Sequence, residues 1–231
     1  MADAIPAQYR GAKMVLYIDN STVPADYIKR LVDRGAMVIQ FNPKDLKAQG
    51  WNFTVDKLRL IRYWAVNLPD YDYVLFRDLD SGLYIRETAA VYEFLDSEMD
   101  FHSMRDTPFH YFPLMGGMWG LKRSALARLP FNFTDKMKNF LMTYPVKQNE
   151  EKWTDQFFLR DIIYPHSKEY TMTHDSYFCD VNKYGYLATK VRPCIFSSTY
   201  CRQNNINDIR FVNLVELGIP HAERRPSNRM Q

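Results

Sequence analysis

Short apolar runs and segments of helical spacing alternate along the first half of the chain. Four apolar runs have the length of buried strands, at residues 13–18, 36–41, 73–77 and 101–104. Between the second and third runs, apolar residues recur three or four positions apart, as at Leu58, Ile61 and Ala65. A strand, a helix and a second strand of this length predict a right-handed parallel crossover.

The same spacing, together with capping and breaking residues, predicts the helices. They are expected at residues 24–34, 54–67, 86–97, 124–129, 135–144 and 154–164. Thr54 caps the second, Pro165 ends the last, and residues 42–52 are expected to form a loop. Beyond Pro165 the pattern is irregular, with short strands near Tyr170 and at 210–214.

This order predicts an α/β fold with a mostly parallel central sheet flanked by helices. The irregular C-terminal part is expected to lie over the active-site end of the sheet. Residues 1–221 are expected to form one domain, since 231 residues suit a single ordinary core. The polar residues 222–231 are expected to form a loose tail.

The composition of the chain limits the binding partners and the cellular location that can be expected for the protein. A net charge of +3 is too balanced for nucleic acid to be the main ligand. No apolar run reaches 18 residues, so no membrane span is predicted, and residues 1–13 lack the apolar core of a signal peptide. Three cysteines without metal-ligand spacing are interpreted as free thiols in the reducing cytoplasm.

The strongest chemical signal is the pair Asp78 and Asp80 at the end of the run 73–77. Side chains two positions apart on a strand point the same way, so the two carboxylates repel each other and resist desolvation. A divalent cation relieves both problems, and Mg²⁺ or Mn²⁺ also accepts phosphate oxygens. The pair therefore indicates a site for a metal and a diphosphate. A second pair, Asp70 and Asp72, follows Pro69 and is interpreted as a solvated turn.

Two further groups follow later strands or turns. Arg105 and Asp106 end the next strand, where Arg105 could bind phosphate or a carboxylate and Asp106 could bind hydroxyls or act as a base. Gly116 and Gly117 could let the backbone approach a ligand, and Trp119 could stack on a sugar face. The structural alternatives are an arginine–aspartate pair, a tight turn and a core tryptophan.

Two later residues each have a structural and a functional interpretation. Asp155 lies in the first turn of a predicted helix, where it favours the helix dipole, but it could also act as a general base in a cleft. His174 could complete a metal shell or could be an ordinary surface or satisfied histidine.

Taken in order, these segments resemble a known family. FRDLDS, FHSMRDTPFH, LMGGMWG, WTDQFFL, HDSYFC and FVNLV occur in an order similar to that of metal-dependent glycosyltransferases of the GT-A fold. The closest resemblance is to a group found in bacteria and in large algal viruses, where such enzymes glycosylate a capsid protein or another surface glycan. The resemblance covers residues 13–214.

The resemblance implies roles for individual residues. Asp78 and Asp80 would hold Mn²⁺ or Mg²⁺ and, through it, the donor diphosphate, and His174 would supply another metal ligand. Asp155 falls where an acceptor-activating carboxylate is often found, and Asp106 competes for that role. The remaining candidates share a role in binding donor or acceptor, and are Arg77, Asp78, Arg105, Gly116, Gly117, Trp119 and Gln156.

The expected activity is transfer of a sugar from a nucleotide diphosphate sugar, with UDP favoured, to a hydroxyl of a glycan or glycoprotein, with inversion preferred. The run 13–18 resembles the second strand of the family rather than the first, which leaves open how the base is recognised. Two alternatives remain at this point. One is a metal-dependent phosphohydrolase with Asp78 as nucleophile, and the other is a non-catalytic module that binds nucleotide sugars.

Overall fold

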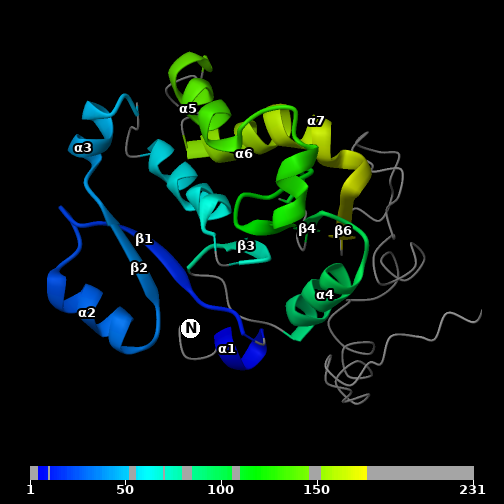
Figure 1. Ribbon diagram of the computed structural model, residues 1–231, viewed down its shortest axis with the longest axis horizontal. Coiled ribbons are helices and arrows are strands. Elements are labelled where there is room, and N and C mark those ends of the chain that lie inside the picture. Colours follow the sequence, from blue (N-terminus) through cyan, green and yellow to red (C-terminus); the bar gives the residue numbers. More distant parts are fainter. Residues whose placement is uncertain are drawn as a thin grey trace, which may run out of the picture.

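The computed structural model describes residues 5–9, 11–51, 56–69, 71–79, 85–105, 110–145 and 152–175 (Figure 1). Its strands are β1 (Val15–Asp19), β2 (Met37–Phe41), β3 (Tyr73–Arg77), β4 (Phe101–Arg105), β5 (Met118–Lys122) and β6 (Thr171–Asp175). Within this part of the chain they form two sheets. β1 and β2 make a parallel pair, and the second sheet has the order β3-β5-β4-β6.

The helical segments connect and cover these strands. They are α1 (Ile5–Gln8), α2 (Ala25–Asp33), α3 (Pro43–Ala48), η1 (Asp56–Asn67), α4 (Ile85–Asp96), η2 (Arg123–Arg128), α5 (Phe133–Thr143), α6 (Thr154–Phe158), η4 (Leu159–Ile163), α7 (Tyr164–Ser167) and η5 (Lys168–Tyr170). Of these, η1, η2 and η5 are 3₁₀-helical and η4 is a π-helix.

The α/β class is confirmed, but the larger sheet is mixed rather than mostly parallel. β4 pairs with β6 in parallel, whereas β5 lies between β3 and β4 and is antiparallel to both. The sequence predicts no strand at β5, and a tight turn is one of the two alternatives for this glycine-rich stretch. Gly120 permits the close pairing, because a Cβ there would lie 2.6 Å from Leu75 Cδ2 and 2.8 Å from the carbonyl of Val74.

This topology brings three strand ends to one edge. β3 and β4 are both antiparallel to β5 and so run in the same direction, and β6 is parallel to β4. The C-terminal ends of β3, β4 and β6 therefore lie at the edge where β5 begins. Asp78, which follows β3, and Gly117, which precedes β5, meet at this edge.

Helices cover both faces of the larger sheet (Figure 1). On one face, α5, α6 and the cyan helix η1 pack over the strands, and an aromatic core of Tyr63, Phe76, Trp119 and Phe158 fills the layer. α4 covers the other face. Side chains alternate along β3, so Phe76 contacts Tyr63 of η1 while Arg77 pairs with Glu87 of α4.

The two-stranded sheet has its own small apolar cluster. Leu16 and Ala36 are its buried members. Tyr17 and Phe41, from the same two strands, pack instead against the main core. The unit formed by β1, α2 and β2 therefore contacts the rest of the molecule through few large side chains.

Two helix predictions need correction. The expected loop at 42–52 contains α3, because the Asn42 side chain accepts from the amide of Lys44 and Pro43 begins the helix without needing an amide partner. The helix expected to end at Pro165 instead continues to Tyr170. The π-helix η4 ends at Ile163, and Pro165 is the second residue of the following helix α7, so the helix changes type here instead of ending.

α1 has no predicted counterpart, and the other remaining helices and strands lie within a few residues of their predicted positions. The expected strand at 210–214, the tail at 222–231, the Thr54 cap and the three cysteines lie outside the described residues. Among the described helices, none combines the length and apolar composition that a membrane span requires.

Candidate functional site

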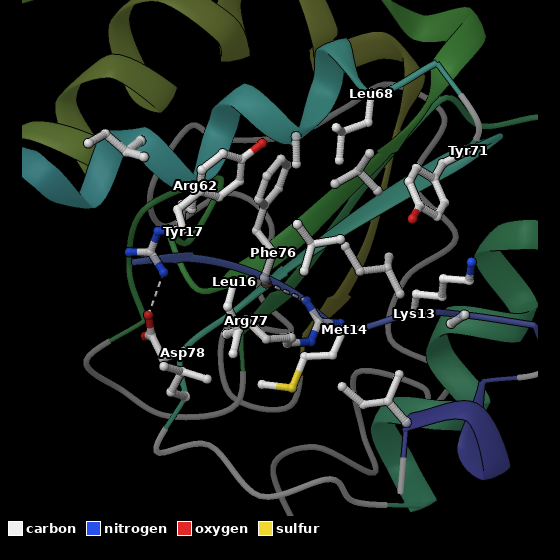
Figure 2. Close-up of a pocket in the computed structure, with 18 of the residues that line it drawn as sticks. Lys13, Met14, Leu16, Tyr17, Arg62, Leu68, Tyr71, Phe76, Arg77 and Asp78 are labelled. Carbon is white, nitrogen blue, oxygen red and sulfur yellow. Dashed lines mark hydrogen bonds and ion pairs between the residues drawn. The ribbon is translucent and has the colours of Figure 1, made fainter. Parts of the chain in front are cut away.

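Asp78 forms the starting point of the site. It follows β3 on the same side of the strand as Phe76 and so faces η1 rather than α4. Its Oδ1 atom lies 2.5 Å from Nη1 of Arg62 (Figure 2), and its side chain is 51% exposed. The carboxylate is therefore open to solvent on one side and bound to a cation on the other.

Arg62 also holds a second carboxylate. Its Nη2 atom donates to Oδ2 of Asp155 over 2.9 Å, so one guanidinium bridges β3 and α6. Sequence reasoning missed Arg62. A signal was present, because Arg62 stands four residues after Leu58 and three before Ala65, on the stripe that faces the core. A charged residue on a buried stripe requires a partner and therefore marks a polar site.

Asp155 is buried at the start of α6. Its side chain is 4% exposed, and its other oxygen, Oδ1, accepts from the amide of Gln156 over 2.9 Å. Burial raises the pKa of Asp155, and the charge of Arg62 opposes that shift. Each oxygen accepts one hydrogen bond and retains a second lone pair, so Asp155 could accept a proton from a substrate hydroxyl while Arg62 stays bound to it.

Gly116 and Gly117 lie directly against the two carboxylates. A Cβ on Gly116 would lie 2.5 Å from Oδ2 of Asp155 and 2.8 Å from Nε2 of Gln156. A Cβ on Gly117 would overlap the carboxylate of Asp78. The glycines allow close approach of the backbone to protein side chains in this structure, and their approach to a ligand stays a prediction.

Gln156 belongs to the same group of residues. It is 6% exposed, and within the described part of the chain its buried Oε1 atom has no hydrogen-bond partner. A buried acceptor without a donor costs free energy, so the atom is suited to receive a hydroxyl or amide from a ligand.

A cavity of about 750 Å³ opens beside Asp78, between β1 and β3. Its walls are mostly apolar and include Met14, Leu16 and Phe76. Figure 2 shows Lys13 and Tyr71 at one end and the Arg62–Asp78 pair at the other. This volume lies within the range of small-molecule sites in proteins.

Polar groups gather at the Asp78 end of the cavity. Tyr17 and Asp19 from β1 line it together with Arg62 and Asp78. Burial raises the pKa of Tyr17 to about 12, so its hydroxyl keeps its proton at neutral pH and can donate. The sequence did not identify these β1 residues as part of the site, because the pattern of this strand does not indicate which element it faces.

Two arginines predicted to bind donor or acceptor are held by acidic side chains. Arg77 lines the cavity but forms an ion pair with Glu87. Arg105 binds Asp175 across the β4–β6 ladder over 2.6 Å, and both side chains are nearly buried. These contacts correspond to the structural alternative of an arginine–carboxylate pair, with Asp175 as a partner of Arg105.

Trp119 does not line a ligand site in this structure. It is 0% exposed, and its ring contacts Tyr63 and Phe76 in the core. Of the two alternatives for Trp119, the core tryptophan accounts for its position, because β5 is a central strand and its alternation directs this side chain into the apolar layer.

His174 lies on the opposite face of the sheet from Asp78. Its Nδ1 atom is 2.9 Å from Nε2 of His102, and its Nε2 atom is 3.3 Å from Oε2 of Glu93 on α4. Since α4 and η1 cover opposite faces, His174 cannot share a metal with Asp78 in this arrangement. The satisfied-histidine interpretation accounts for this residue.

Three observations bear on a metal at this edge. Asp80 and Asp106 lie outside the described residues. Within the described ranges, no cluster of three or more His, Cys, Asp or Glu side chains has the geometry of a metal site. Asp78 nonetheless holds a positive group, the Arg62 guanidinium, in the place where a cation is expected. The half-exposed carboxylate thus has the chemistry of a cation ligand.

The charge state of His110 is influenced by two carboxylates at this edge of the sheet. Partial burial lowers its pKa, and the negative charges of Asp78 and Asp175 oppose the shift. His110 therefore lies within electrostatic reach of both carboxylates.

Comparisons with protein-family models, with curated proteins and with solved structures find no match to this chain.

Proposed function

We propose that this protein is a metal-dependent glycosyltransferase of the GT-A class. It moves a sugar from a nucleotide diphosphate sugar, with a UDP-sugar favoured, to a hydroxyl of a glycan or glycoprotein. The observation that carries the proposal is the 750 Å³ cavity that ends at Asp78. Its apolar body suits a base and ribose, and its charged end suits a diphosphate.

The chemistry is a substitution at the anomeric carbon. The bond from that carbon to the phosphate oxygen breaks, a bond to the acceptor oxygen forms, and the acceptor proton passes to a carboxylate. Mn²⁺ or Mg²⁺ held by Asp78 and Asp80 would stabilise the negative charge that develops on the departing diphosphate. Arg62 lies at the same end and adds positive charge there.

Two carboxylates remain candidates for the base. Asp155 is close to the cavity end through Arg62, and each of its oxygens retains a lone pair beside the hydrogen bonds from Arg62 and from the amide of Gln156. Asp106 is the alternative. The unpartnered Oε1 atom of Gln156 is suited to orient the acceptor hydroxyl beside Asp155.

The test is a calorimetric titration of a panel of nucleotide sugars, with and without Mn²⁺, on the wild-type protein and on Asp78→Ala. We expect one nucleotide sugar to bind in a Mn²⁺-dependent manner and Asp78→Ala to lose at least tenfold in affinity, because the first metal ligand is gone. Equal binding by the variant, or binding indifferent to Mn²⁺, would contradict the proposal.

One observation favours a second function, a non-catalytic module that binds nucleotide sugars. Asp155 accepts hydrogen bonds from Arg62 and from the amide of Gln156, and both stabilise the carboxylate and so make it a weaker base. The discriminating measurement is release of the nucleoside diphosphate from the bound donor, in the presence of a mixed panel of glycan acceptors. Binding without any release would favour the module.

A further inference from the structure

Arg62 occupies the centre of the charged group. From η1 it contacts one carboxylate on β3 and one on α6, at 2.5 Å for Asp78 and 2.9 Å for Asp155. Its own side chain is 22% exposed. The Arg62 guanidinium thus neutralises both Asp78, a proposed metal ligand, and Asp155, a candidate base.

The two contacts differ in their exposure to water. Asp155 is 4% exposed, so removing its counter-ion would leave a buried charge without compensation. Asp78 is 51% exposed, and water can replace its counter-ion at little cost. The contact with Asp78 is therefore the one that can be exchanged.

The surrounding backbone fixes Asp155 further. The amide of Gln156 holds one of its oxygens, and the lack of a side chain on Gly116 leaves room for the other. Asp78 follows the last residue of β3, next to the cavity, and within the described residues its carboxylate is held by the Arg62 side chain and not by a backbone amide.

We propose that Arg62 is a positioning residue that takes the place of a divalent cation on Asp78 and yields this carboxylate when the cation binds, while remaining on Asp155. The inference rests on the proposed function. Two cations on one carboxylate repel each other, so occupation by Arg62 and by metal are in competition. The protein would hold its metal ligand neutralised until the metal arrives.

The test measures Mn²⁺ binding by electron paramagnetic resonance, without donor or acceptor, so activity does not enter the result. In Arg62→Met the competing charge is absent, and we expect Mn²⁺ to bind roughly fivefold more tightly than in the wild type, as suits a half-exposed ion pair. Arg59→Met is the matched control. Arg59 lies three residues earlier on η1 and donates to the carbonyl of Lys152 rather than to a carboxylate.

Each outcome decides between the alternatives. Tighter binding in Arg62→Met but not in Arg59→Met supports the inference. Equal binding in the wild type and both variants overturns it and leaves the proposed function standing. An absence of Mn²⁺ binding in all three proteins overturns both the inference and the metal-dependent part of the proposed function.

A second pair of variants covers the case in which Arg62→Met does not fold. Arg62→Met with Asp155→Asn removes the buried carboxylate together with its counter-ion. It is compared with Arg59→Met combined with Asp155→Asn. The same fivefold difference in Mn²⁺ affinity is expected between them, and equal affinities would overturn the inference.

Discussion

Gly117 lies so close to Asp78 that no side chain could stand between them. The two residues come from the end of β3 and the start of β5, which pair antiparallel with Arg77 opposite Met118. The position of the Asp78 carboxylate is therefore set by a backbone contact as well as by Arg62.

The contact predicts strong coupling between substitutions at the two positions. Gly117→Ala should destabilise the protein by roughly 1–3 kcal/mol, because the new methyl group displaces the carboxylate. Gly117 does not have a positive φ, so backbone strain does not contribute. In an Asp78→Ala background the cost should largely disappear. Urea denaturation of the four proteins measures the coupling, and additive effects would show that the contact does not constrain Asp78.

Arg62 should stabilise the protein in a pH-dependent manner. Burial raises the pKa of Asp155 above 3.8, and Arg62 limits the rise, so Arg62→Met should raise it further. An acid with a raised folded-state pKa contributes stability below its unfolded pKa and loses it as pH rises through the folded value. Arg62→Met should therefore be destabilised by about 2 kcal/mol at pH 7 and by less at pH 4.

Unfolding free energies of Arg62→Met at several pH values check this expectation. The double variant Arg62→Met with Asp155→Asn serves as the control, since it lacks the carboxylate at position 155 and should recover most of the stability at pH 7. A difference between Arg62→Met and the wild type that stays constant from pH 4 to pH 7 would mean that Asp155 is not the group responsible.

The buried pair His102 and His174 predicts a second pH dependence. Burial lowers the pKa of both imidazoles below 6.5, and for His102 the neighbouring His174 lowers it further, whereas Glu93 opposes the shift of His174. The unfolded chain therefore binds more protons below pH 6.5 than the folded protein does. Their contribution to stability is present above pH 6.5 and is lost as pH falls, by about 1.4 kcal/mol per pH unit for each histidine.

Urea denaturation between pH 7.5 and pH 5 tests this pair. His102→Gln and His174→Gln cannot take up the proton, so each should reduce the slope of stability against pH, and the double variant should reduce it most. The slope is the relevant quantity, because either substitution also changes the packing. An unchanged slope in the double variant would contradict the assignment.

The cavity between β1 and β3 can be filled deliberately. Met14 lines it, and Met14→Trp places an indole in the space assigned to the nucleotide. We expect donor binding to fall at least tenfold, Mn²⁺ binding to persist, and stability to change by less than about 1 kcal/mol, since the ring enters existing space.

Calorimetry with the donor identified for the wild type checks the effect of Met14→Trp. Met142→Trp is the matched control, because Met142 is an exposed methionine, 53% accessible, on α5. Undiminished donor binding by Met14→Trp would place the nucleotide elsewhere.

Local patterns predicted most of the elements. The helix α4 and the strands β3 and β4 could be predicted from the spacing of apolar residues and from helix-breaking residues within a short stretch of sequence. β5 could not be found in this way. Gly120 and Trp119 form a strand because β3 and β4 supply partners on both sides, and this information is not local.

The candidate site was predictable in part. Asp78, Asp155, Gln156, Gly116 and Gly117 do come together, and the motifs that contain them were recognised. For His174 and Trp119 the sequence left a structural and a functional alternative open, because the face that a side chain occupies depends on which neighbours its strand acquires. Arg62 was detectable as a charge on an apolar stripe, but its partners lie 16 and 93 residues away.

A ligand bound in the cavity between β1 and β3 would also stabilise the folded protein. On one side the occupant would touch the cluster around Leu16, and on the other the core that contains Phe76. It would fill the space between these two apolar clusters and contact both of them. Saturating ligand should then raise the melting temperature, and its departure should loosen the N-terminal unit first.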